Sequence, residues 1–283
     1  MTEQEDPELA AILGRIAGSD SAGPRRGSTR GRSAVEWSVL MRQLGTAMAA
    51  SAQKAGVAAV ASGRWLADVV VDAAPRIPVR DLATLERQHP GLGREALADA
   101  LVTGAVRGTM AVGVAGGALT GIQWTVPVSM VVIPIQLAVE VAAVAAIEIK
   151  LVAELHEVYG VPVQGTATQR GAAYALSWAN RRGVNPLEPA TMAAALGVAA
   201  RRRVQRRLLA RFGRGLGTLA PLMAGAAYGA YSNRRQTQIL SDSLRSDLRR
   251  RPIMTGLTGA AVVKLLETGR SPRLRRGRRS AAP

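Results

Sequence analysis

A run of 32 residues without a charged side chain, from Gly108 to Val139, constrains the fold of this chain most. Its first half contains glycines four residues apart, and residues with that spacing lie on one face of an α-helix. A glycine face lets a second helix approach backbone to backbone, either between two membrane-embedded helices or inside one chain. We therefore predict a helix-packing groove, which comprises Gly104, Gly108, Gly113, Gly117 and Gly121.

The composition favours closely packed helices. Hydrophobic residues make up 48% of the 283 residues, but aromatic residues only 3%. Strands favour aromatic and β-branched side chains, and no stretch alternates between apolar and polar residues. The chain has no cysteine, which excludes disulfides and thiolate chemistry. These features predict an all-α fold, a multi-helix bundle with a central Gly/Ala-rich apolar helical hairpin and disordered termini.

We expect one helical domain over residues 35–269. Residues 1–34 contain a short apolar stretch and then become rich in Gly, Ser and Arg, so we predict a disordered segment there. Residues 270–283 form a disordered basic tail. Within the domain, the apolar hairpin covers about 94–159 and basic helices cover about 188–268.

Turn and stop signals divide this domain into helices. The first is expected from about Glu36 to Asp72, with a break at Gly63, and a helix from Pro127 to Tyr159 should kink at Pro134. Further helices are predicted over about 81–88, 94–123, 166–182, 188–212, 215–250 with a break, and 253–268.

The uncharged run is too long for one bilayer crossing and too short for two. The sequence Trp124-Thr125-Val126-Pro127 predicts a turn at its centre, which leaves arms of roughly 16 residues, or about 24 Å each. Glu140 and Glu148 follow in the second arm, and a carboxylate in the bilayer interior is costly. The hairpin either dips into or just spans a membrane, or it is buried in a soluble bundle.

The net charge of +17 is concentrated in the C-terminal part, because residues 161–283 contribute +19. A cluster of seven arginines lies beside an apolar stripe of Val204, Leu208 and Phe212, as in an amphipathic helix at an anionic membrane surface. A solvated basic face and nucleic-acid binding are the alternatives, although the region has few aromatic residues for stacking. The candidate anionic-surface residues are Arg201, Arg202, Arg203, Arg206, Arg207, Arg211 and Arg214.

No pattern of catalytic residues is present. His156-Glu157 begins the zinc-protease pattern H-E-x-x-H, but Gly160 occupies the last position. Phosphate-binding and serine-hydrolase motifs do not occur. We therefore expect no catalytic residue, metal, cofactor or small-molecule substrate, and we interpret Glu140, Glu148 and Glu154 as polar contacts of a helix or as exposed side chains.

Residues 94–160 resemble the core of the EcsC family. A helix ends in a Gly-rich region, a Pro-containing apolar helix follows, and Leu155-His156-Glu157-Val158-Tyr159-Gly160 closes the segment. The chain departs from the family at the turn, where Thr125-Val126-Pro127 stands in place of an Asp-x-Pro sequence. The resemblance implies a helical, membrane-linked protein without enzymatic activity, of the kind found in hypothetical proteins of actinomycetes, and it transfers no catalytic residue.

Together these patterns predict a non-enzymatic, membrane-associated protein. The hairpin would lie at or in the inner membrane, and the arginine-rich helices would bind anionic lipid on its cytoplasmic face, since the N-terminus lacks a signal-peptide pattern. The alternatives are a soluble cytoplasmic module whose groove takes a partner helix or a second copy, and a basic nucleic-acid-binding protein.

Overall fold

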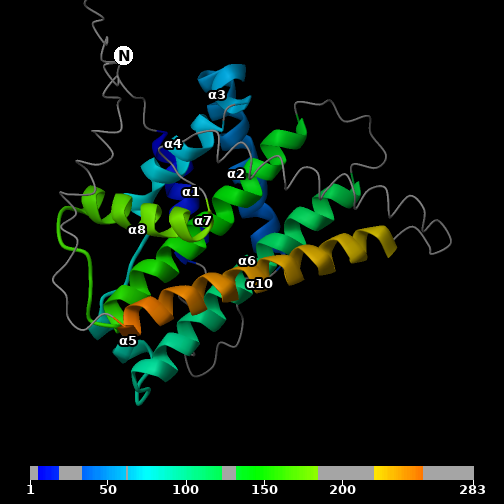
Figure 1. Ribbon diagram of the computed structural model, residues 1–283. Helices are drawn as coiled ribbons and strands as arrows, with labels where there is room; N and C mark the ends of the chain where they lie inside the picture. Colours follow the sequence, from blue (N-terminus) through cyan, green and yellow to red (C-terminus); the bar gives the residue numbers. More distant parts are fainter. Residues whose placement is uncertain (1–5, 19–33, 62, 123–131, 184–219, 251–283) are drawn as a thin grey trace, which may run out of the picture.

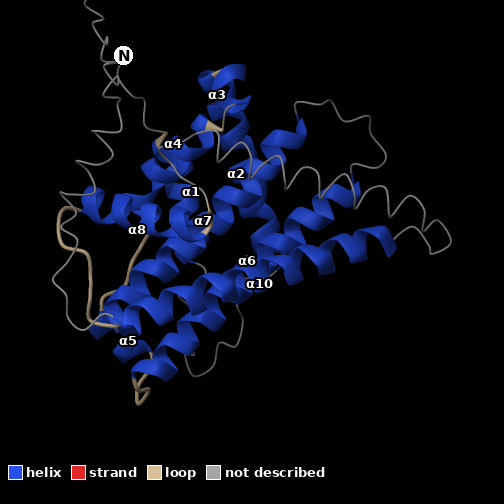
Figure 2. Ribbon diagram, viewed as in Figure 1, coloured by secondary structure: helices blue, strands red, loops and turns tan. Residues whose placement is uncertain are grey.

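The computed structural model describes residues 6–18, 34–61, 63–122, 132–183 and 220–250. These residues form helices and no strand, so the predicted all-α class is confirmed (Figure 2). The helices are α1 (Pro7–Ala17), α2 (Ala34–Ala55), α3 (Val57–Ala61), α4 (Arg64–Ala73), α5 (Leu82–Gln88), α6 (Arg94–Ile122), α7 (Val132–Val158), α8 (Ala167–Arg181) and α10 (Ala220–Arg250), and a short 3-10 helix, η2 (Ala74–Arg76), follows α4.

Helix α7 is the centre of the bundle. It contacts α1, α2, α4, α5, α6, α8 and α10, and these helices cover it on its sides (Figure 1). Its segment from Ala142 to Leu155 is apolar around most of the helix, which is the pattern of a buried helix. The central apolar segment of the chain is therefore the axis about which the other helices pack.

Helices α6 and α10 form a second layer beside α7. They run antiparallel along most of their length, as the two lowest long helices in Figure 1. Helix α10 is continuous from Ala220 to Arg250, so the break predicted within residues 215–250 does not occur in this part. Helix α6 begins at Arg94 and is described to Ile122, close to the predicted bounds.

The first predicted helix is interrupted twice. Gly56 and Gly63 have φ angles of 83° and 75°, a left-handed conformation that glycine adopts without steric cost. The break at Gly63 agrees with the sequence prediction, whereas the break at Gly56 is unexpected. As a result, α2, α3 and α4 are separate helices instead of one long rod, and α2 and α4 both pack against α7.

The prediction of a disordered segment over residues 1–34 is wrong for Pro7–Ala17. These residues form α1, whose apolar face is buried against α7, α2 and α4. Leu9, Leu13 and Ile16 recur at helical spacing and are 3%, 1% and 0% exposed. Burying three such side chains contributes about 1.5–3 kcal/mol each, which offsets the entropy of ordering this short helix.

Pro134 is the third residue of α7 in the described part. Backbone N–H groups in the first helical turn have no acceptor within the helix, so proline costs nothing there. Proline kinks a helix only from an interior position, so no kink is expected from Pro134 in the described part of α7. The predicted turn at Trp124–Pro127 lies outside the described residues, as do the predicted helices over 188–212 and 253–268.

Candidate functional site

The seam between α6 and α10 contains a close approach of two backbones. A Cβ atom placed on Gly113 would lie 2.5 Å from the carbonyl carbon and oxygen of Gly229, and one on Gly229 would lie 2.5 Å from the oxygen of Gly113. Both are shorter than real Cβ contacts, so each position requires glycine as the backbone stands. The partner helix at Gly113 is a segment of the same chain.

Polar contacts continue this seam one turn further along. Asn233 donates from its side-chain amide to the backbone oxygen of Thr109 at 2.9 Å. The hydroxyls of Thr109 and Thr237 are 3.0 Å apart, and Thr237 also donates to Glu148 at 2.7 Å. Since Thr237 gives its proton to the carboxylate, the one proton of the Thr109 hydroxyl is shared between the Thr237 oxygen and the Val106 backbone oxygen, which lies 3.1 Å away.

These contacts fix the register of the three long helices. Ile122 follows Gly113 by nine residues, and Ala220 precedes Gly229 by nine, so the described ends of α6 and α10 lie at one level. Gly108 meets Ile147 of α7, and counting outwards from that pair places Val132 near the same level. The uncharged parts of α6 and α10 therefore lie side by side on the right in Figure 1, whereas the first turns of α7 diverge from them towards the top of that view.

The side chains around this uncharged end include exposed apolar and aromatic groups. Val114 of α6 is 46% exposed, and Tyr228 and Tyr231 of α10 are 43% and 62% exposed. Immediately below them, the first charged residues of α6 and α10, Arg107, Arg234 and Arg235, are also exposed. On α6 and α10, therefore, exposed apolar and aromatic side chains are followed by three exposed arginines.

A buried carboxylate joins α7, α8 and α10. Glu148 is fully buried and accepts hydrogen bonds from the indole of Trp178 at 2.8 Å, from Nε of Arg182 at 2.9 Å and from Thr237 at 2.7 Å. A second guanidinium nitrogen of Arg182 pairs with its other oxygen, and Arg182 also donates to Gln236 at 3.0 Å. The bonds to Glu148 offset the cost of burying a carboxylate, and the cation of Arg182 lies beside it.

A second buried pair lies further along α7. Arg80 donates two bonds of 2.7 Å to the two oxygens of Glu154, and its backbone N–H adds a third at 3.3 Å. The ammonium of Lys150, which is 0% exposed, lies 3.6 Å from the same carboxylate. This cluster fixes the segment before α5 to the centre of the bundle.

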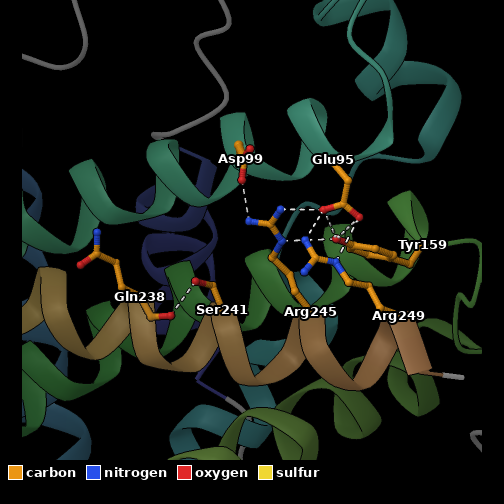
Figure 3. Close-up of polar contacts among 7 residues, drawn as sticks. All are labelled: Glu95, Asp99, Tyr159, Gln238, Ser241, Arg245 and Arg249. Atoms are coloured by element: carbon orange, nitrogen blue, oxygen red, sulfur yellow. Dashed lines mark hydrogen bonds and ion pairs between the residues drawn. The ribbon is translucent and has the colours of Figure 1, made fainter.

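The third cluster lies at the opposite end of the α6–α10 seam from the glycines. Figure 3 shows Arg245 and Arg249 of α10 reaching Glu95 and Asp99 of α6 and Tyr159, which directly follows α7. The contact with Arg249, with help from Arg245 and Tyr159, lowers the pKa of Glu95 from 4.5 to about 2. Figure 3 also shows Ser241 donating to the Gln238 backbone oxygen, a bond within α10.

A cleft of about 490 Å³ opens between η2, the end of α7 and the start of α8. Its walls include Ile77, Asp81, Glu157, Arg170 and Tyr174. Burial raises the pKa of Glu157, with a smaller contribution from Asp81, and burial also raises the pKa of Tyr174. Both groups therefore keep their protons to a higher pH than they would in water.

The structure disperses the residues considered as metal ligands. Glu148 and Glu154 are paired with arginines, and Nδ1 of His156 lies 2.7 Å from the Val152 backbone oxygen, as its donor. Glu140 is half-buried on α7. Within the described ranges, no group of three or more His, Asp or Glu side chains could hold a metal ion.

The predicted groove residues have different surroundings. Gly104 is half-buried on α6, a Cβ atom added to Gly108 would lie 3.3 Å from the Ile147 side chain, and Gly113 meets Gly229. Gly117 and Gly121 belong to α6, but their surroundings lie outside the described side chains. The predicted anionic-surface residues Arg201, Arg202, Arg203, Arg206, Arg207, Arg211 and Arg214 lie outside the described residues, so their role stays a prediction.

Sequence reasoning missed the partners of the buried charges and the exposed tyrosines. Trp178, Arg182 and Thr237 are far from Glu148 in sequence, and nothing in one sequence pairs them. Tyr228 and Tyr231 carry a usable signal, since they are aromatic residues at the charged end of the 215–233 uncharged run.

Comparisons with known proteins identify no relative. No protein-family model, curated protein or solved structure matches this chain. The resemblance of residues 94–160 to the EcsC family therefore rests on the sequence pattern alone.

Proposed function

We propose that this is a non-enzymatic protein that associates with the cytoplasmic face of the inner membrane through its uncharged helix ends. One observation supports the proposal: beyond their charged residues, the uncharged parts of α6 up to Ile122 and of α10 from Ala220 lie side by side at one end of the seam. In a bundle surrounded by water, exposed helix surfaces usually carry charged side chains at both ends.

The depth of the uncharged end favours insertion into one leaflet. On α7 the segment from Val132 to Val139, beyond Glu140, rises about 12 Å. Half of a hydrocarbon core is about 15 Å thick. Counted from the contact of Gly108 with Ile147, Glu140 lies about 10 Å beyond the level of Arg107 towards the uncharged end, so this depth applies to α7 alone.

By length and hydropathy alone, a different part of α6 would be the candidate membrane segment. Among the described residues, one helix segment, Arg94–Ala115, is long and apolar enough to cross a bilayer, but 50% of the qualifying window is buried in the bundle. Glu95 and Asp99 within it pair with Arg245. This favours a core helix in water for that half of α6, with only its far end at the membrane.

The alternatives gain less support. A soluble module with an open glycine groove needs that groove free for a partner helix, but Gly113 is already covered by Gly229. Nucleic-acid binding depends on the arginine cluster of residues 201–214, which lies outside the described residues. The resemblance to the EcsC family, with its membrane-linked members, favours the proposed function.

The test compares two exposed valines of similar exposure at opposite ends of the bundle. Val114→Lys places a charge on the uncharged end, and Val79→Lys places one beside Arg80, where Val79 is 41% exposed. We expect Val114→Lys to release the full-length protein from the membrane pellet and from vesicles, and Val79→Lys to leave it bound. Equal binding of the two variants, or recovery of the wild type in the detergent-free supernatant, would refute the proposal.

A further inference from the structure

We infer that Arg107, Arg234 and Arg235 form a collar that binds the phosphates of anionic phospholipid headgroups, with Tyr228 and Tyr231 in the layer just above it. This inference rests on the proposed function and adds to it a headgroup site and an orientation. The three arginines belong to two helices, and the register of the seam places them at one level along it.

The register places these arginines at one level. Gly113 faces Gly229 and Thr109 contacts both Asn233 and Thr237, so Arg107 lies level with the residues just beyond Arg235. All three arginine side chains are exposed, and none has an ion-pair partner among the described residues. Three cations therefore face solvent in a band across α6 and α10.

The contrast with the other arginines of α10 supports a role in binding. Arg245 and Arg249, in the charged half of the same helix, pair with Glu95. The two cations nearest to the uncharged end have no such carboxylate beside them among the described residues. Guanidinium groups bind phosphate oxygens in a bidentate manner, so an anionic headgroup matches this band in charge and geometry.

The tyrosines lie in the position expected of an interfacial aromatic layer. Tyr228, Tyr231 and Arg235 are spaced three and four residues apart, so they share one exposed face of α10. Tyr231 lies about 4.5 Å and Tyr228 about 9 Å above Arg234 along the helix. Tyrosine rings gather at headgroup level, with arginines at the aqueous side of the ring layer.

The test uses two double variants that lose the same charge. Arg234→Gln/Arg235→Gln removes part of the collar. Arg94→Gln/Arg250→Gln removes two exposed arginines from the far ends of α6 and α10, about 20 Å away. Binding of the full-length protein is measured on phosphatidylcholine vesicles with and without phosphatidylglycerol.

We expect the collar variant to lose roughly 20- to 30-fold in partitioning onto vesicles with phosphatidylglycerol. The control variant should bind like the wild type, and neither should change binding to vesicles of phosphatidylcholine alone. Equal loss in the two variants would overturn the collar, because it would show that only net charge matters. A collar variant that loses binding to nucleic acid instead of vesicles would overturn it as well.

A second readout measures the orientation directly. Since the chain has no cysteine, a single environment-sensitive label can be placed at Ala227→Cys, on the uncharged side of the collar, or at Asp242→Cys, on the charged side. Both positions are exposed on α10. We expect spin-labelled lipid to quench the label at residue 227 and not the one at residue 242.

The results distinguish failure of the proposed membrane association from failure of the arginine collar. If the wild type binds neither kind of vesicle, the proposed function fails and the collar with it. If the wild type binds but the label at residue 227 stays in water, or both labels are quenched alike, the membrane association stands and the collar is wrong.

Discussion

A methyl group added at Gly113 tests the close packing of α6 against α10. Gly113→Ala raises helix propensity, which by itself would stabilise the protein by about 1 kcal/mol. The new Cβ, however, would lie 2.5 Å from backbone atoms of Gly229, whereas ordinary contacts begin at about 3.4 Å. Backbone cannot rotate away as a side chain can, so the helices must separate by about 1 Å.

The change in the free energy of unfolding is the balance between the cost of overpacking and the gain in helix propensity. Overpacking costs about 1–3 kcal/mol, and a separated seam also weakens the bond from Asn233 to Thr109, worth about 1 kcal/mol. After the propensity gain, we expect a net loss of about 1–3 kcal/mol in the free energy of unfolding. For a chain of this size that lowers Tm by roughly 2–12 °C.

Two other helical glycines provide matched controls. Gly45 of α2 has no atom within 4 Å of the position that an added methyl group would take, so Gly45→Ala should raise Tm through propensity alone. Gly108 faces the flexible end of Ile147 at 3.3 Å, and Gly108→Ala should change Tm little. Thermal unfolding followed by far-UV circular dichroism ranks the three variants. If Gly113→Ala is as stable as Gly45→Ala, the seam is not closely packed and the reasoning is refuted.

Three further predictions concern charged groups. Because the pKa of Glu95 is lowered to about 2, its stabilising effect is complete above pH 4.5 and lost as the pH falls towards 2; Glu95→Gln should remove this acid-dependent loss in urea titrations. The pKa of Glu157 is raised, so ionisation opposes folding, and Glu157→Gln should raise Tm at neutral pH but not below pH 4.5. Arg182→Met leaves the buried Glu148 without its cation and should cost about 3–5 kcal/mol in urea unfolding, part of which Glu148→Gln restores.

The sequence predicted best the helices whose ends are marked by capping residues or by proline and glycine. The bounds of α5, α6 and α8 lie close to the predictions, because Asp81 caps α5, His89-Pro90-Gly91 separates α5 from α6, and Thr166 with Gln169 caps α8. Gly56 shows the limit of such signals. Gly45 lies within α2 and Gly56 ends it, yet both are glycines in an Ala-rich sequence. Only the φ angle that the surrounding packing imposes distinguishes them.

Long-range pairing decided what the sequence left open. The pattern Leu9, Leu13 and Ile16 was visible, but an isolated helix of this length is marginal, and contact with α7 makes it stable. The partner of the glycine series was likewise undetermined. Gly229 lies in a different uncharged run, and its contact with Gly113 appears only when α6 and α10 are placed antiparallel.

The two halves of the α6–α10 seam are held by different forces, and the difference suits a boundary between water and lipid. In the charged half, Arg245 and Arg249 pair with Glu95, contacts that gain from nearby apolar burial and weaken with salt. In the uncharged half, Gly113 and Gly229 touch through their backbones. Inside a membrane the hydrophobic effect no longer drives helices together, and close van der Waals packing replaces it. Backbone contact at Gly113 therefore keeps its strength in either solvent, whereas an ion pair at the same level would lose its hydration on insertion. The change from ion pairs to glycines along one seam is what the proposed depth of insertion requires.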